Sequence, residues 1–291
     1  MRKSLFLSTL MFVLGLSGLA LAQDGEASFE ASVDADGAAA DADMGGAEGG
    51  ITAYTARGLT LDKGTLRIDV GPGDRALLQR GAGFVVNETG SPLGAFINLN
   101  AGAGFGIIDN LEAGVVILPL GLAPSGVDVY GDPTAYGRYQ LLDGDTQLAV
   151  QVDVLLPAST FFGFGVAVPV KFALGENMHL NTGARFGFRD TPVTATLSIE
   201  VPVEFAVNIM PALFFGLATG LNIRNLDIGF DSGAIPLEVF AGYTMGLAGH
   251  QLDITAGFGF PGFLSFGPGA SNPVADVWQL TIGGNFHMDI L

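Results

Sequence analysis

Three alternating stretches, at residues 162–174, 178–189 and 193–207, decide the fold of this chain. They read FGFGVAVPVKFAL, MHLNTGARFGFR and VTATLSIEVPVEFAV. In each stretch, apolar side chains fill every second position, and glycine, small, polar or charged residues lie between them. Successive side chains of a β-strand point to opposite faces, so this period of two predicts three strands that each have one apolar face.

The same period continues along most of the chain and marks twelve candidate strands. Most are roughly 10 to 15 residues long, whereas strands of globular proteins average about 5–6 residues and a tilted membrane-crossing strand needs about 9–11. Residues 82–88 or 51–57 could pair as well, so the expected count ranges from 10 to 14. The predicted strands are 65–72, 96–107, 111–120, 133–142, 146–156, 162–174, 178–189, 193–207, 209–224, 235–245, 250–260 and 277–289.

The connections between these strands alternate between short and long. The short ones are 108–110, 143–145, 175–177, a tight junction at Asn208, and 246–249. The long ones include 73–95, 121–132, 225–234 and 261–276. This alternation is typical of an all-β, antiparallel transmembrane β-barrel with short periplasmic turns and longer extracellular loops.

The composition favours such a barrel over two alternatives. The chain is 49% apolar and only 14% charged, and it holds 44 glycines, whereas soluble domains average about 25% charged residues. A soluble β-sandwich has a strongly polar outer face, but here the second face is rich in glycine with scattered charges. A single transmembrane helix would need the 19 uncharged residues between Glu204 and Arg224, and Asn208, Pro211 and two glycines interrupt that stretch.

Several function classes are excluded or left without support. Twelve basic residues against 29 acidic ones would repel nucleic acid. The absence of cysteine excludes disulfides, thiolate metal sites and a thiol nucleophile. Residues 257–262 match the letters of a dinucleotide fingerprint, but Pro261 stands where a helix should open. We therefore expect no cofactor, no metal and no catalytic residue.

The N-terminal region is predicted to lie outside the barrel. Residues 1–22 have a basic start, an apolar run and an Ala-Leu-Ala cleavage site, as in a secretory signal peptide. Residues 23–50 contain eight acidic residues, no lysine or arginine, and mostly alanine, glycine and serine besides. Such a segment cannot bury enough apolar area to fold, so we expect a disordered periplasmic segment followed by a barrel over 51–291.

Aromatic residues are predicted at both ends of the strands, on the apolar face, as expected at the two interfaces of a membrane. Near the short-turn end lie Phe105, Tyr139, Phe172, Phe205, Tyr243 and Phe286. Near the opposite end lie Phe162, Phe164, Phe186, Phe188, Phe258, Phe260 and Trp278.

Charged residues of both signs fall on the other face, which would line the barrel lumen. They can pair across a narrow barrel and hold its shape, or they can form a mixed-charge constriction that sets selectivity. The sequence leaves both interpretations open. The candidates nearest mid-strand are Arg138, Asp153, Arg185, Glu200, Glu238 and Asp253.

The last predicted strand contains Thr281, Gly283, Phe286 and Met288 in the order polar, glycine, aromatic, hydrophobic. This spacing resembles the C-terminal signal that barrel-assembly machinery recognises in its clients. Such clients commonly end in phenylalanine, whereas this chain ends in Leu291. The resemblance implies that the assembly machinery is a partner.

The body as a whole, over about residues 58–291, resembles the outer-membrane β-barrels of Gram-negative bacteria. Its opening, residues 57–66 (RGLTLDKGTL), is similar to the start of a barrel family associated with phenol meta-cleavage pathways, which implies small hydrophobic cargo. We expect an outer-membrane channel or transporter for small hydrophobic or polar solutes, with lipid around it. A plugged barrel that binds or supports through its extracellular loops is the alternative, and an outer-membrane barrel hydrolase is a third.

Overall fold

The computed structural model describes residues 51–70, 85–89, 96–99, 101–116, 120–123, 133–156, 162–190, 195–223, 233–267 and 277–290. The predicted signal peptide and acidic segment lie outside these residues, as do most of the long loops. Within the described ranges, no helix is long and apolar enough to cross a membrane. The uncharged stretch between Glu204 and Arg224, disfavoured above as a membrane helix, forms two strands and a turn.

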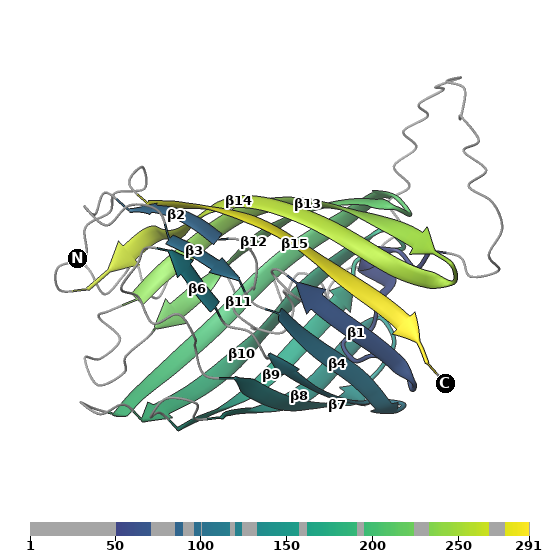
Figure 1. The fold of residues 1–291 in the computed structure, drawn as a ribbon, viewed down its shortest axis with the longest axis horizontal. Helices are drawn as coiled ribbons and strands as arrows, with labels where there is room; N and C mark the ends of the chain where they lie inside the picture. Colours follow the sequence, from purple (N-terminus) through teal and green to yellow (C-terminus); the bar gives the residue numbers. More distant parts are fainter. Residues whose placement is uncertain are drawn as a thin grey trace, which may run out of the picture. The chain divides into compact units, whose positions relative to one another are not determined.

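Fifteen strand segments make up the described chain, together with one short 3-10 helix, η1, at Tyr54–Ala56 (Figure 1). The strands are β1 (Thr65–Val70), β2 (Val85–Thr89), β3 (Phe96–Leu99), β4 (Ala101–Ile108), β5 (Leu111–Val116), β6 (Leu120–Ala123), β7 (Thr134–Leu142), β8 (Thr146–Leu155), β9 (Gly163–Ala173), β10 (Met178–Asp190), β11 (Ala195–Met210), β12 (Leu213–Ile223), β13 (Gly233–Leu247), β14 (His250–Phe266) and β15 (Val277–Asp289).

These segments form one antiparallel sheet that closes into a barrel of twelve strands, as predicted. The ring runs β1-β4-β5-β7 and then in chain order to β15, and β15 returns to pair with β1 from Thr65↔Asp289 to Val70↔Gly284. The other three segments extend this wall beyond β1, β4 and β5. β2 continues along β15, β3 pairs with β2, and β6 pairs with β3. Part of the predicted loop 73–95 is thus strand, in agreement with the possible pairing of 82–88.

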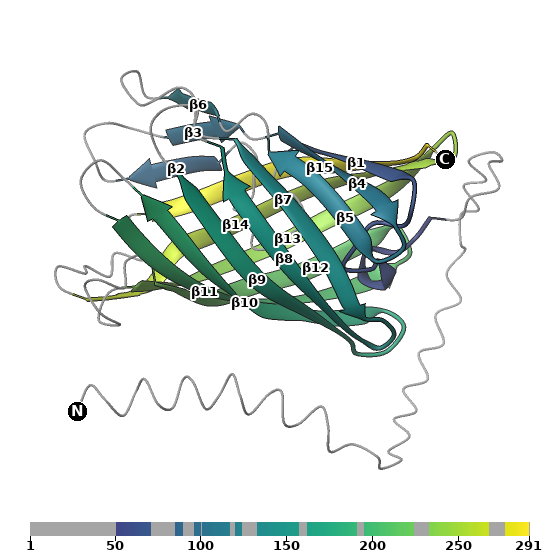
Figure 2. The same ribbon diagram turned by 90° about the horizontal axis from the view of Figure 1, so that it is seen from below.

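The short turns lie together at one rim, the right-hand end of the barrel in Figures 1 and 2. Positive φ angles mark several of them, including Ala248 (51°) and Gly249 (87°) between β13 and β14. Two successive positive φ angles are what a two-residue type I′ hairpin requires. One turn was misplaced, because β11 runs through Asn208 and the chain reverses after Met210. The Asn208 side chain instead donates to the carbonyls of Met210 (3.2 Å) and Pro211 (3.2 Å) and braces this turn.

Pro169 and Pro202 lie inside strands. A proline removes a hydrogen-bond donor from the ladder, so the sequence predicts a β-bulge at each, and this prediction is wrong. Pro169 pairs with Gly183 and Pro202 pairs with Gly220, and the register is the same on both sides of each proline. A β-carbon on either glycine would contact the proline backbone, at 3.0 Å for Gly183 and 2.8 Å for Gly220. The missing side chain lets the facing strand approach, so the ladder accommodates the proline without an extra residue.

The two faces of the wall differ as the period of two predicted. On β9, for example, Phe164, Val166 and Val168 are 47%, 39% and 39% exposed on the outside, whereas inward Lys171 is 5% exposed. The outer aromatics at the long-loop end contact one another: the ring centroids of Phe164 and Phe188 are 5.4 Å apart, and those of Phe258 and Trp278 are 6.0 Å apart. The exterior is therefore apolar, and the buried polar residues are on the inside.

Candidate functional site

The lumen holds the charged residues that alternate with the apolar exterior. Glu112 on β5 is fully buried and accepts hydrogen bonds from three wall side chains. They come from Tyr136 Oη (2.6 Å), Arg67 Nη2 (3.2 Å) and Arg138 Nη1 (3.2 Å). Arg67 also donates from Nε to Asp69 (3.0 Å). Two buried guanidinium groups thus share two carboxylates, which is how charge is tolerated away from bulk water.

A chain of hydrogen bonds from β7 to β10, continued by one ion pair to β11, extends this cluster around the wall. Arg138 Nε donates to Gln151 Oε1 (3.1 Å), and Gln151 Nε2 donates to Asp153 Oδ1 (2.8 Å). Arg185 then donates to Asp153 through Nε (3.0 Å) and Nη2, and its Nη1 lies 3.8 Å from Glu200 Oε2. We call this row, from Arg67 to Glu200, the wall network.

Glycines on the lumen face provide the space for the wall side chains. A β-carbon on Gly104 would lie 2.7 Å from Tyr136 Oη, and one on Gly216 would lie 2.5 Å from Cε1 of Phe240. In the same way, a β-carbon on Gly242 would lie 2.6 Å from Cε2 of Phe214. Many inward glycines are therefore seats for rings and guanidinium groups, so the high glycine content does not by itself indicate open space.

Residues 51–64 occupy the lumen at the short-turn rim rather than joining the wall. We call them the N-terminal segment; they show as the purple coil inside the barrel in Figures 1 and 2. Within it, the Tyr54 ring stacks on Phe214 of β12, with centroids 4.2 Å apart and planes at 8°. The Tyr54 hydroxyl donates to Glu204 Oε1 (3.1 Å), and the Thr55 amide donates to Asn208 Oδ1 (2.9 Å).

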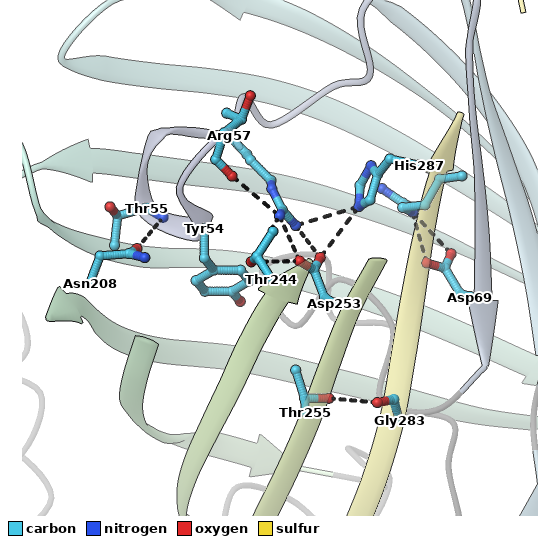
Figure 3. A network of polar contacts seen from close by, with 12 residues as sticks. Tyr54, Thr55, Arg57, Asp69, Asn208, Thr244, Asp253, Thr255, Gly283 and His287 are labelled. Atoms are coloured by element: carbon cyan, nitrogen blue, oxygen red, sulfur yellow. Dashed lines mark hydrogen bonds and ion pairs between the residues drawn. The ribbon is translucent and has the colours of Figure 1, made fainter. Parts of the chain in front are cut away.

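Arg57 makes the most extensive contact between this segment and the wall (Figure 3). Its guanidinium forms a two-pronged ion pair with Asp253 of β14, in which Nη2 lies 2.7 Å from Oδ1. Asp253 is fully buried and also accepts from Thr244 Oγ1 (2.8 Å). His287 Nε2 lies 3.4 Å from Arg57 Nη1 and 3.6 Å from Asp253 Oδ2. Forked pairing of this kind fixes both distance and orientation.

The rest of the N-terminal segment is held mainly through its backbone. The Leu59 amide donates to Gln147 Oε1 (2.9 Å), and the Leu59 carbonyl accepts from Arg138. The Leu61 amide donates to Glu112 Oε2 (3.1 Å), and the Arg57 carbonyl accepts from Lys171. The segment therefore contacts the lumen faces of strands on both sides of the barrel.

A cavity of about 450 Å³ remains between the N-terminal segment and the wall. Its lining includes the chain's three histidines, His179, His250 and His287, together with Arg57 and Lys171. No cluster of three or more metal-binding side chains occurs among the residues described.

The six residues predicted for a constriction all lie on the inner face, but they do not form one site. Arg138, Asp153, Arg185 and Glu200 belong to the wall network, whereas Asp253 holds Arg57 at the short-turn rim. Glu238 is elsewhere and accepts from Thr281 Oγ1 (2.7 Å).

Sequence reasoning missed the N-terminal segment, which it had assigned to the barrel wall or to a connection. The available signal was small: Arg57 is the first basic residue after Lys3, and it follows the acidic stretch closely. Of the proposed assembly signal, Thr281 points into the lumen toward Glu238, and Phe286 pairs with the exposed Ile68 of β1. Gly283 and Met288 lie on the same strand, β15.

Comparisons with known proteins were made at the levels of sequence and structure. No protein-family model matches the sequence, and no curated protein sequence matches it. Among solved structures, an outer membrane channel from Pseudomonas putida F1 is 13% identical, with 79% of this chain and 97% of that chain covered and a TM-score of 0.47. An anion-selective porin from Comamonas acidovorans is 10% identical over 77% and 73% of the two chains (TM-score 0.37). A bacterial polysaccharide outer membrane secretin is 13% identical over 78% and 98% (TM-score 0.39).

Proposed function

We propose that this chain is an outer-membrane channel through which small molecules pass along a mixed-charge lumen. The observation that supports the proposal is the closed ring of twelve strands with an apolar outside and a charged inside. Exposed rows such as Phe164, Val166 and Val168 are unfavourable in water but suit lipid, and closure gives each of the twelve ring strands a neighbour on both sides. Membrane lipid and the barrel-assembly machinery are the partners that this placement implies.

The wall network is the proposed selectivity element. It brings three cationic and four anionic side chains, from Arg67 to Glu200, into one continuous row on the lumen face. Rings of charged side chains set the preference of a pore for cations or anions. Arg185 is the member best placed to meet a solute, because its side chain keeps 22% exposure while that of Arg138 is fully buried.

A plugged barrel with a structural or surface-binding role is the second candidate. One observation favours it: the N-terminal segment lies across the lumen and is hydrogen-bonded to several strands. Transport would then be absent, and the long loops would be the functional surface. Among the described residues, no side-chain contact favours a barrel hydrolase.

The first experiment tests the membrane barrel itself. The purified protein is run on SDS gels with and without boiling, and a folded barrel should migrate differently in the two lanes. A chain that shows no shift and stays soluble without detergent would not be a membrane barrel.

The second experiment tests for a pore by recording single-channel currents in planar bilayers. Arg185→Gln should move the reversal potential in a salt gradient toward cation preference, because it removes a partly exposed positive charge. Arg189→Gln is the matched control, since Arg189 is on the same strand but exposed at its long-loop end. Insertion without current in the wild type and both variants would favour the plugged barrel.

A further inference from the structure

The two candidate functions differ only in whether the N-terminal segment stays in the lumen. Its contacts with the wall fall into two kinds. Near its C-terminal end, the segment is joined to the wall by hydrogen bonds between backbone groups. Further back, every described contact involves a side chain, either of the wall or of the segment.

The C-terminal end of the segment is built as a fixed point. The Gly64 amide donates to the Gly106 carbonyl (2.8 Å), and the Gly64 carbonyl accepts from Ile290 (2.9 Å). The Thr65 amide closes a turn to the Asp62 carbonyl (3.0 Å), with Gly64 at a φ of 81°. Glycine adopts this left-handed conformation without the cost that other residues meet. Gly64 therefore ties the segment to β4 and to the end of β15.

The wall groups that hold the remainder of the segment also have partners within the wall. Glu112 keeps Arg67, Arg138 and Tyr136 when the Leu61 amide is taken away. Asp253 keeps Thr244 and lies 3.6 Å from His287. A buried polar group left without any partner is costly, so these alternative contacts lower the cost of losing the segment.

The same holds at the aromatic end of the segment. Glu204 keeps Asn181 Nδ2 (3.2 Å), with His179 Nε2 at 3.3 Å, after the Tyr54 hydroxyl leaves. Asn208 keeps the carbonyls of Met210 and Pro211. The three buried carboxylates Glu112, Asp253 and Glu204 therefore each keep a wall contact with or without the segment, as expected of a contact that opens and closes.

We propose that residues 51–63 are a gate, pivoting at Gly64, and that the Arg57–Asp253 ion pair is its latch. This inference rests on the proposed channel function. Tyr54 on Phe214 is the second hold, and the two together keep the segment across the short-turn mouth. When both are released, the segment leaves the lumen toward the short-turn side and the passage widens to the wall.

The absence of native cysteine allows a clean cross-linking test. In the double variant Thr55→Cys/Asn208→Cys, a short reducible bis-thiol reagent would tie the segment to the β11 wall, since the Thr55 amide lies 2.9 Å from Asn208 Oδ1. Cross-linked protein should stay in its low-conductance state in planar bilayers, and reductant should restore the open events. Each single-cysteine variant, treated alike, controls for loss of the Asn208 brace and for labelling.

Release of the latch is the complementary test. Arg57→Gln combined with Tyr54→Ala should raise the fraction of time in the open state by about tenfold or more, because a charge-assisted pair and a stacked ring are lost from the closed state. Arg189→Gln, which removes a cation at the exposed long-loop end of β10, far from the short-turn mouth, should leave the open fraction unchanged.

The outcomes separate the gate from the channel. If all variants conduct with equal open fractions, and cross-linking changes nothing, the gate is wrong while the channel function stands. If the wild type and the released variant both insert and remain silent, the channel function itself is wrong.

Discussion

Glu112 is the residue on which the wall network depends most heavily, and Glu112→Gln is the sharpest test of that network. The glutamate is fully buried, and all four of its described partners are donors: Tyr136 Oη, Arg67 Nη2, Arg138 Nη1 and the Leu61 amide. A glutamine of the same shape must turn its NH₂ group toward some of these donors. At least one donor loses its acceptor, and Arg138, also fully buried, loses its carboxylate partner.

The size of the effect follows from the burial of the pair. Removing one partner of a buried ion pair costs about 3–5 kcal/mol because the remaining charge stays uncompensated. With a urea dependence of about 3 kcal/mol per molar, the unfolding midpoint should fall by roughly 1 to 2 M. The assay is urea unfolding of the refolded protein in detergent micelles, followed by the loss of the compact band on unboiled gels and by Trp278 fluorescence.

The control is Glu176→Gln, in the exposed turn before β10, which removes the same charge from the chain. An exposed substitution of this kind changes stability by no more than about 0.5 kcal/mol. If Glu112→Gln shifted the midpoint no further than Glu176→Gln, water would have to solvate the Arg67 and Arg138 guanidinium groups in place of the carboxylate. The description of these groups as buried in the wall network would then be refuted.

Two further predictions concern the glycine seats and the last strand. Gly216→Ala should destabilise the barrel by about 1–3 kcal/mol in the same urea assay, because its β-carbon would lie 2.5 Å from Phe240 Cε1 and 2.8 Å from the Phe205 carbonyl. Gly137→Ala, whose β-carbon meets nothing within 4 Å, should be neutral or slightly stabilising, and equal losses in the two variants would contradict the seat interpretation. Phe286→Ala should lower the amount of folded barrel in the outer-membrane fraction more than Phe172→Ala does, since only Phe286 belongs to the proposed assembly signal. Equal yields from these two variants would show that Phe286 acts as an ordinary lipid-facing aromatic.

The lumen charges divide between two interpretations that the sequence left open. The lumen charges were expected either to hold the barrel together or to select solutes. In the structure, Arg138 and Glu112 are fully buried, whereas the Arg185 side chain keeps 22% exposure. The first two therefore have the environment of structural groups, and Arg185 has the environment expected of a residue that meets a solute.

The strands, the twelve-membered ring and the two faces of the wall could all be predicted from the amino-acid pattern. These features follow from local rules: side chains alternate every residue, turns need glycine or asparagine at special φ angles, and lipid-facing positions are apolar over about ten residues. The misplaced turn near Asn208 and the absent bulges at Pro169 and Pro202 are local errors. Asn208 braces a turn that comes two residues later, and a glycine on the neighbouring strand accommodates each proline.

The contents of the lumen could be recognised only in the folded barrel. Tyr54 meets Glu204 and Arg57 meets Asp253 across 150 and 196 residues of chain, and no periodicity connects positions so far apart. The local pattern of residues 51–57 allowed a further strand in the wall, and nothing local indicated that the segment lies in the lumen. Its position depends on closure of the ring. The lumen around Arg57 forms only when β1 pairs with β15.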